Sequence, residues 1–230
     1  MRMPEFMPTI PDTTRYSPAD SAFSKIRVRL LLHILIAFLF PVDTIHAQGS
    51  VRSLLEFRHQ NVVIQKWDLS CGAAALTTLL NFQHGENLTE KEVAVTLMNR
   101  PEYIDNPQLI QIREGFSLLD LKRYTESLGY KGIGLGKMEF KDLVSRAPLL
   151  VPIKTNGYNH FVVFRGMRGN RVLLADPAWG NRTMLVDEFV YVWIEYPSLG
   201  RVAFSVERSD GYKPDDHALI PNGKDYVMLQ

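Results

Sequence analysis

The pattern of apolar and polar positions divides the chain into a helical first half and a strand-rich second half. A polar, aromatic run ends at Ser70, and an alanine- and leucine-rich run begins at the next residue. Apolar residues at positions 76, 79, 80 and 82 share one helical face. Ser70 is placed to cap the first turn with its hydroxyl, and Gly85 is typical of a helix end. We therefore predict a buried helix that begins at Cys71.

Further helices follow in the same half. Thr89 and Glu92 have the spacing of a capping box, which predicts a second helix behind Thr89. Residues 100–114 contain two prolines and little periodicity, so we expect a loop there that overhangs a cleft. Apolar periodicity after Ser117 predicts a helix that ends at Gly129, and the stretch 140–146 predicts one short helix more.

The second half is predicted to form an antiparallel sheet. Short apolar runs are separated by turn residues, among them the hairpin signal Gly169-Asn170. Helices first and a sheet second indicate an α+β fold. A short helix is expected at 187–193, and strands are expected at 130–136, 149–154, 160–166, 171–175, 183–186 and 201–206.

The N-terminal part has the features of an export signal. Within 23–47, three basic residues precede the apolar run Leu30–Phe40, and a small-residue cleavage site follows it. The run is shorter than the ~20 residues that span a bilayer, which favours a cleaved signal, with an uncleaved anchor in the inner membrane as the alternative. We expect a periplasmic or secreted protein, preceded by a disordered lead at 1–22.

Composition adds few constraints. Residues 48–208 suit one domain with one core, and 209–230 form a polar tail that we expect to be loosely held. The 26 Lys and Arg residues nearly balance 25 Asp and Glu, so no strong field favours nucleic acid as a partner. No metal-ligand spacing or glycine-rich phosphate loop occurs, and we expect neither a metal nor a cofactor.

Cys71 is the only cysteine of the chain and the predicted first residue of the buried helix. The positive end of a helix dipole favours the thiolate, which is the nucleophilic form. A small buried residue that happens to be cysteine is the alternative interpretation. An exported protein normally pairs its cysteines, and an unpaired thiol there is open to oxidation, which favours a reactive role.

His160 and Asp176 complete a candidate site. Pairing outward from the predicted hairpin turn brings both to the same open end of the sheet, where Asp176 can accept from one ring nitrogen of His160. Helix packing on the sheet would add Cys71, which yields a nucleophile, a base and an orienting acid. Each alone has an ordinary alternative, a satisfied polar histidine or an Asp-Pro turn. Gln65 is either an oxyanion donor or a loop glutamine.

These residues resemble the peptidase C39 family of papain-like, double-glycine leader peptidases. The resemblance rests on three blocks in the family's order: Gln65-x5-Cys71-Gly72, Asn159-His160-Phe161-Val162-Val163 and Asp176-Pro177-Ala178. It implies a papain-like fold, with Cys71 as nucleophile, His160 as general base, Asp176 as its orienter and Gln65 as oxyanion donor. One departure is Ser70, since the family usually has Asp directly before the cysteine.

Many relatives are domains of ABC transporters, but the export signal makes this chain more similar to stand-alone C39-like proteins of Gram-negative bacteria. Such a protein accompanies functional-amyloid (Fap-type) secretion genes. The resemblance implies a cysteine endopeptidase that cuts a secreted or leader-bearing peptide after small, double-glycine-like residues, with an export-system or outer-membrane partner. Trp67, Tyr158 and Trp179 either line the substrate groove or belong to the core.

Two other functions remain open from the sequence. The domain can bind a secreted peptide without cutting it, as an adaptor or chaperone of an export apparatus. It can also use the same thiol chemistry on another bond, as a cysteine amidase, a transglutaminase-type acyl transferase or a thioesterase.

Overall fold

The computed structural model describes residues 53–229. The predicted lead and export signal, residues 1–47, lie outside the described residues. Within 53–229, no helix is long and apolar enough to cross a membrane.

A six-stranded antiparallel sheet forms the centre of the fold, with the strand order β1-β8-β2-β3-β4-β5. Its outer strands are β1 and β5. The last strand in sequence, β8, lies between β1 and β2 and pairs antiparallel with β1. The strands are β1 (Tyr130–Leu135), β2 (Leu149–Thr155), β3 (Tyr158–Arg168), β4 (Arg171–Asp176), β5 (Gly180–Leu185) and β8 (Ala203–Arg208). A separate two-stranded sheet pairs β6 (Glu195–Tyr196) with β7 (Gly200–Arg201).

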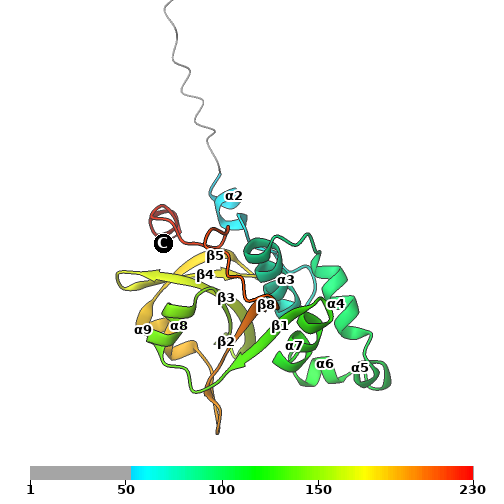
Figure 1. Cartoon of the computed structure of the whole chain (residues 1–230). Helices are drawn as coiled ribbons and strands as arrows, with labels where there is room; N and C mark the ends of the chain where they lie inside the picture. The colour runs from blue at the N-terminus through cyan, green and yellow to red at the C-terminus, as the bar shows by residue number, and fades with distance from the viewer. Residues whose placement is uncertain (1–52, 230) are drawn as a thin grey trace, which may run out of the picture. The chain divides into compact units, whose positions relative to one another are not determined.

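Helices cover both faces of the sheet (Figure 1). One side carries α3, α4 and α7, and the other carries α8 and α9. The helices are α2 (Leu54–His59), α3 (Cys71–His84), α4 (Glu90–Met98), α5 (Pro101–Asp105), α6 (Leu109–Ile112), α7 (Leu118–Ser127), α8 (Phe140–Arg146), α9 (Val186–Val192) and α10 (Asp225–Met228). The segment 100–114, which we expected to be a loop, thus holds two short helices.

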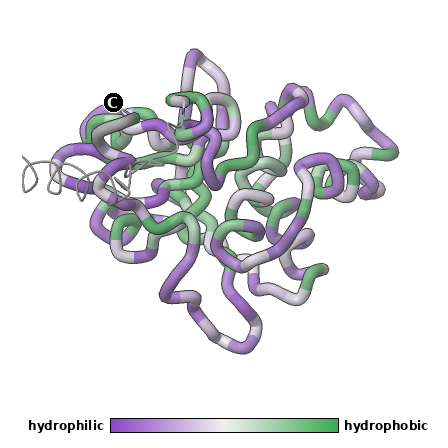
Figure 2. Tube along the Cα trace, turned by 90° about the horizontal axis from the view of Figure 1, so that it is seen from above, coloured by the Kyte–Doolittle hydropathy of each residue, from purple (hydrophilic) through white to green (hydrophobic). Residues whose placement is uncertain are grey.

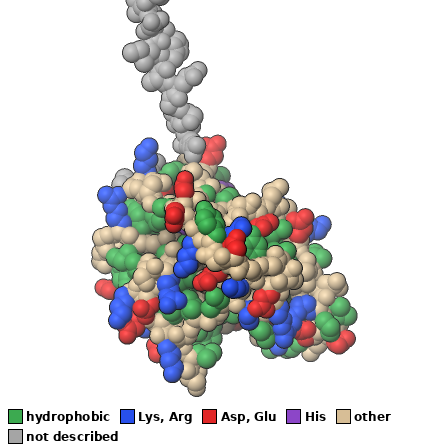
Figure 3. Space-filling model, viewed as in Figure 1, with side chains coloured by type: hydrophobic (Ala, Val, Ile, Leu, Met, Phe, Trp, Pro, Cys, Tyr) green, Lys and Arg blue, Asp and Glu red, His purple; other side chains and the backbone are tan. Residues whose placement is uncertain are grey.

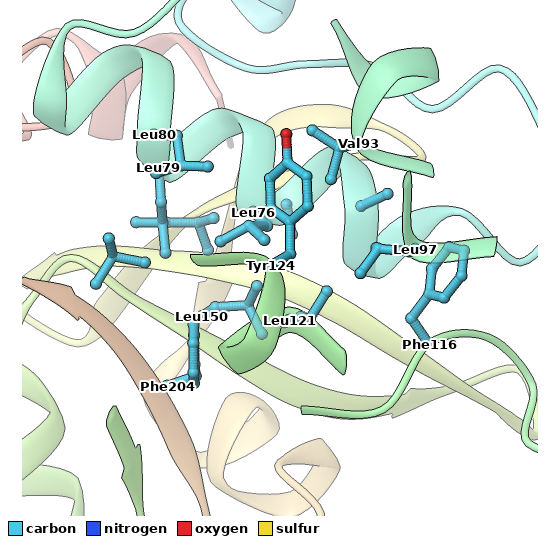
Figure 4. Close-up of a cluster of buried hydrophobic side chains, with 14 of the residues drawn as sticks. Leu76, Leu79, Leu80, Val93, Leu97, Phe116, Leu121, Tyr124, Leu150 and Phe204 are labelled. Atoms are coloured by element: carbon cyan, nitrogen blue, oxygen red, sulfur yellow. The ribbon is translucent and has the colours of Figure 1, made fainter. Parts of the chain in front are cut away.

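Each face of the sheet has its own hydrophobic core. Figure 4 shows the first, in which Leu76 and Leu79 of α3 lie over sheet residues such as Leu150 and Phe204. The second lies under α8 and α9 and includes Phe164. Hydrophobic segments run through these interior elements, whereas the projecting loops are mostly hydrophilic (Figure 2). Acidic and basic side chains are interspersed on the face shown in Figure 3, which fits the near-neutral charge.

Local signals placed α3, α4 and α7, but the predicted cap at the start of α3 differs in the structure. The Thr89 hydroxyl accepts from the Glu92 amide and the Glu92 carboxylate accepts from the Thr89 amide, as the capping box predicts. Ser70 does occupy the N-cap position of α3, but its side chain makes no capping bond. Its hydroxyl instead donates to Glu90 Oε1 at 2.5 Å and lies 2.7 Å from the Trp67 carbonyl. The Ser70 side chain is thus directed to the buried carboxylate of α4 instead of to the helix amides.

A β-bulge interrupts the pairing of β3 with β4. The register shifts between Phe164 and Gly166, so Arg165 is an extra residue in β3. Gly166 has φ of +152°, and a Cβ there would lie 3.0 Å from Pro221. Only glycine fits this backbone without strain.

The bulge decides which face of the sheet Asp176 occupies. Counting outward from the hairpin turn without an extra residue would place Asp176 opposite Val163, on the face away from His160. In the structure Val163 instead pairs with Ala175, and extending this register by one residue puts Asp176 opposite Val162. A one-residue shift moves a side chain to the other face of a strand. Asp176 thereby comes to the face that His160 occupies.

The tail is not loosely held, contrary to our expectation for 209–230. The buried guanidinium of Arg165 donates from Nε to the Leu219 carbonyl at 2.9 Å and from Nη1 to Asn181 Oδ1 at 2.7 Å. Leu219 is itself fully buried. The bulged residue thus fastens the tail to the sheet, and the segment around Leu219 is part of the folded domain.

The replacement Arg165→Met should lower the free energy of unfolding by about 2–4 kcal/mol, because it leaves the Leu219 carbonyl and the Asp225 carboxylate, 3.7 Å from Arg165, without their buried cation. Urea denaturation measures the change. Arg168→Met, at an exposed position of the same strand, is the matched control and should stay within ~0.5 kcal/mol of the wild type. Equal stabilities of the two variants would contradict this role of Arg165.

Candidate functional site

Cys71 is the first residue of α3 and lies at its N-terminus, with 4% of its surface exposed. The first helical bond runs from the Ala74 amide to the Ser70 carbonyl, so the Cys71 amide precedes the bonded ladder and remains available to a ligand. The next residue, Gly72, lies against β3, where a Cβ would meet the Phe161 ring at 3.2 Å. This close approach sets the helix N-terminus directly beside the strand that carries His160.

His160 connects Cys71 to Asp176. Its Nε2 lies 2.7 Å from Asp176 Oδ1, and the neighbouring Cys71 side chain acts together with Asp176 to raise the pKa of the ring. Because Nε2 is used by the carboxylate, Nδ1 is the ring nitrogen left for the sulfur. His160 is the third residue of β3 rather than the start of a strand.

The charges around His160 stabilise its protonated form. Burial alone would lower the pKa of His160, but the hydrogen bonds to Asp176 and Cys71, together with their charges, raise it to about 9. The ring is therefore an imidazolium at neutral pH, which places a positive charge beside the Cys71 side chain.

Asp176 is fully buried at the end of β4, and three donors converge on it. Besides His160, the Ala178 amide donates to Oδ1 at 2.9 Å and Arg182 Nε donates to Oδ2 at 2.8 Å. Burial would raise the pKa of Asp176, but the His160 bond and charge, Arg182 and the Ala178 amide hold it below its usual range. The carboxylate stays ionised and fixes the orientation of the ring.

Arg182 was not recognised from the sequence. Leu174 pairs with Arg182 and Asp176 pairs with Gly180, so Arg182 is a diagonal neighbour of the carboxylate on the same face. The sequence does show a basic residue in the strand that follows the Asp-Pro turn. Its position beside Asp176 could be inferred only once the register of β5 against β4 was known.

Gln65 lies in the loop before α3, and its backbone connects this loop to the residues around Asp176. Its amide donates to the Pro177 carbonyl at 2.9 Å, which ties the loop to the residue after Asp176. Its side-chain Nε2 donates to the Trp67 carbonyl at 3.4 Å, and its Oε1 has no hydrogen-bond partner. A bond this long is weak, so the side-chain amide is free to turn toward another acceptor.

The three aromatic residues near the site are exposed rather than part of the core. Trp67, Tyr158 and Trp179 have 46%, 67% and 63% of their surfaces exposed. Trp67 forms one wall of an apolar cavity of about 620 Å³ that α4 closes on the other side, with Val95 and Met98 in its lining. The core interpretation of these aromatic residues was therefore wrong.

Another cavity, of about 470 Å³, has His160 in its lining and is bounded by the segment before α7. Glu114 of this segment accepts the Asn159 amide at 3.0 Å, next to His160. Gly115 lies against the loop before α3, where a Cβ would come within 3.0 Å of the Leu69 carbonyl. The predicted overhanging segment therefore contacts both halves of the site. Among residues 53–229, no group of three or more His, Cys, Asp or Glu side chains is arranged to hold a metal ion.

Comparison with known proteins identifies the family. Residues 59–197 match the Peptidase C39 family. This chain belongs to the peptidase C39 family. The match includes the sequence blocks around Cys71, His160 and Asp176, on which the resemblance rested.

Two relatives of this C39 chain carry the name "Probable functional amyloid protease FapD". The protein from Pseudomonas aeruginosa PAO1 is 37% identical over 144 residues, which cover 62% of this chain and 61% of that protein. The protein from Pseudomonas fluorescens is 35% identical over 143 residues, with the same shares of 62% and 61%. The matched part spans less than two thirds of the length of these relatives.

Solved C39 peptidase domains share the fold. The peptidase domain of Streptococcus ComA, a bifunctional ABC transporter, has a TM-score of 0.51 at 18% identity and covers 66% of this chain and 100% of that domain. A double-glycine-motif protease from an AMS/PCAT transporter, solved with its leader peptide, has a TM-score of 0.51 at 20% identity, with shares of 66% and 96%. The α+β, papain-like fold class is thus confirmed.

The replacement Asp176→Asn should slow the alkylation of Cys71 by iodoacetamide at pH 7 by roughly tenfold or more. Asparagine offers one acceptor oxygen where three donors converge, and the imidazolium that stabilises the thiolate is lost. Since Cys71 is the only cysteine, mass spectrometry of the labelled chain reports its reactivity alone. The exposed Asp187→Asn is the control. An unchanged rate in Asp176→Asn would remove the carboxylate from the activation of Cys71.

Proposed function

We propose that the chain is a cysteine endopeptidase that uses Cys71, His160, Asp176 and Gln65. The observation that carries the proposal is the buried hydrogen bond of His160 to Asp176, together with the Cys71 side chain that neighbours the same ring at the N-terminus of α3. Family membership supports a peptidase, and the protease names of the Pseudomonas relatives agree with it.

The acylation half of the reaction begins with attack of the Cys71 thiolate on the scissile carbonyl carbon. The carbonyl electrons move to oxygen, and this oxyanion accepts hydrogen bonds from the Cys71 amide and the Gln65 side-chain amide. His160 then gives its Nδ1 proton to the leaving nitrogen. The C–N bond breaks, the amine product departs, and a thioester on Cys71 remains.

The deacylation half returns the protein to its starting state. Neutral His160 takes a proton from water while the oxygen of that water attacks the thioester carbon. The C–S bond breaks, the acid product departs, and the sulfur leaves as a thiolate beside the reformed imidazolium. Throughout, Asp176 keeps Nε2 bonded and the ring in place.

The substrate in this proposal is a secreted or leader-bearing peptide cut after small, double-glycine-like residues. The apolar cavity between Trp67 and α4 offers hydrophobic surface beside the loop that precedes Cys71, which suits apolar side chains of such a peptide. A solved protease of the same fold is described as a double-glycine-motif protease in complex with a leader peptide. That description supports testing a leader-like substrate first.

We also propose export to the periplasm or beyond, on the strength of the apolar run in 23–47. The Pseudomonas relatives carry functional amyloid in their names, which makes a secreted amyloid protein or its export apparatus the partner to test first.

The purified full chain should cleave a quenched fluorescent peptide that contains a double-glycine site, and Cys71→Ala should abolish this cleavage while circular dichroism stays unchanged. Cys71→Ser should also be nearly inactive, because a serine hydroxyl needs stronger activation than a thiol. Tyr191→Ala, at a highly exposed position of α9, is the control and should retain the wild-type rate.

Cleavage by Cys71→Ala would contradict the assignment of the nucleophile. Peptide binding by the wild type without cleavage would instead favour the adaptor or chaperone function. Transfer of the acyl group to an added amine, with little hydrolysis, would favour an acyl transferase.

A further inference from the structure

Glu90 is a buried carboxylate whose hydrogen bonds all run to the loop between Gln65 and Cys71. It is the first residue of α4 and only 4% exposed. Both of its oxygens accept from the Lys66 amide, at 3.0 Å each, and Oε1 also accepts from the Ser70 hydroxyl at 2.5 Å. A carboxylate is stable in such a place only because these donors compensate for its lost hydration.

These two contacts hold the two ends of the loop. Lys66 directly follows Gln65, and Ser70 directly precedes Cys71, so one carboxylate fixes the spacing between the two proposed oxyanion donors. The network also extends to the Gln65 side chain. The Trp67 carbonyl lies 2.7 Å from the Ser70 hydroxyl and accepts from Gln65 Nε2 at 3.4 Å.

The loop needs such a support because its backbone is strained. Leu69 has φ of +66°, a left-handed conformation that costs a residue other than glycine on the order of 1–3 kcal/mol. Strain of this size persists only where surrounding contacts over-determine the conformation. The carboxylate of Glu90 and the close packing of Gly115 against the Leu69 carbonyl are those contacts.

We propose that Glu90 is a positioning residue that holds the Gln65 amide and the Cys71 amide in place for the oxyanion. The inference rests on the proposed peptidase function and concerns one half of its site. Glu90 makes none of its hydrogen bonds to His160 or Asp176, so it acts on the stabilisation of the oxyanion and leaves the activation of the thiol unchanged.

Two measurements on the full chain separate these effects. In Glu90→Ala, kcat for the double-glycine peptide should fall roughly 10- to 100-fold with KM nearly unchanged, because the lost contacts matter mainly in the transition state. Alkylation of Cys71 by iodoacetamide forms no oxyanion and should keep its wild-type rate. Glu90→Gln, which still offers an oxygen to the Lys66 amide, should recover most of kcat.

Glu92→Ala is the matched control for damage to α4. Glu92 lies on the same helix and caps it through Thr89, but it is exposed and makes no bond to the loop. It should lower stability by about 1 kcal/mol and leave kcat unchanged. Should Glu90→Ala fail to fold, Ser70→Ala removes one of the two contacts and should lower kcat several-fold.

A double-mutant cycle with Gln65→Ala gives the sharpest outcome. Gln65→Ala alone should lose about 10²-fold in kcat. If Glu90 acts on the oxyanion donors, the loss of kcat in the double variant should be clearly smaller than the product of the two single losses, because only the Cys71 amide then remains to be displaced. Three results would overturn the inference. The losses of kcat in the double variant could multiply, Glu90→Ala could keep the wild-type kcat, or the alkylation of Cys71 could slow as much as kcat does in Glu90→Ala. A wild type without turnover would overturn the proposed function together with it.

Discussion

The hydrogen bond between His160 and Asp176 is the interaction on which the rest of the site depends. A fully buried carboxylate is costly unless donors surround it, and here His160, the Ala178 amide and Arg182 all converge on it. The same arrangement fixes the imidazole ring and keeps it protonated beside Cys71. Without the carboxylate, burial would lower the pKa of the ring and its positive charge beside Cys71 would be lost.

The sheet provides this bond through an irregularity rather than through regular pairing. The extra residue Arg165 moves Asp176 to the face of His160, and its guanidinium is also the group that fastens the C-terminal segment at Leu219. One bulge therefore serves both the His160–Asp176 pair and the attachment of the tail. Gly166 makes the bulge possible, because its backbone conformation and its contact with Pro221 exclude a side chain.

Much of the fold could be predicted because its signals are local. The capping box at Thr89, the glycine after α3 and the hairpin turn before β4 each act over a few residues. The capping bond at Ser70 was predicted wrongly because the Ser70 hydroxyl donates to Glu90. This carboxylate lies twenty residues away in sequence and reaches the hydroxyl only after α4 has packed. Local signals alone do not show such a tertiary contact.

The candidate site shows the same division between local and tertiary information. The residue types and their order indicated Cys71, His160 and Asp176. In the structure Asp176 is hydrogen-bonded to His160, and the Cys71 side chain neighbours the same ring. The roles of Arg182 and Glu90 were not predicted, because a charged residue is expected at the surface unless its burial and strand register are known. Both support residues that the sequence had already indicated.

An NMR titration of the histidine rings in the full chain tests the central claim most directly. The account predicts that His160 keeps its proton well above the ordinary value of 6.5 and titrates at about 9. His84 serves as an internal reference, because burial lowers its pKa below 6.5. A His160 titration at or below 6.5 would contradict the account, since the ring would then be neutral at pH 7 and no imidazolium would face Cys71.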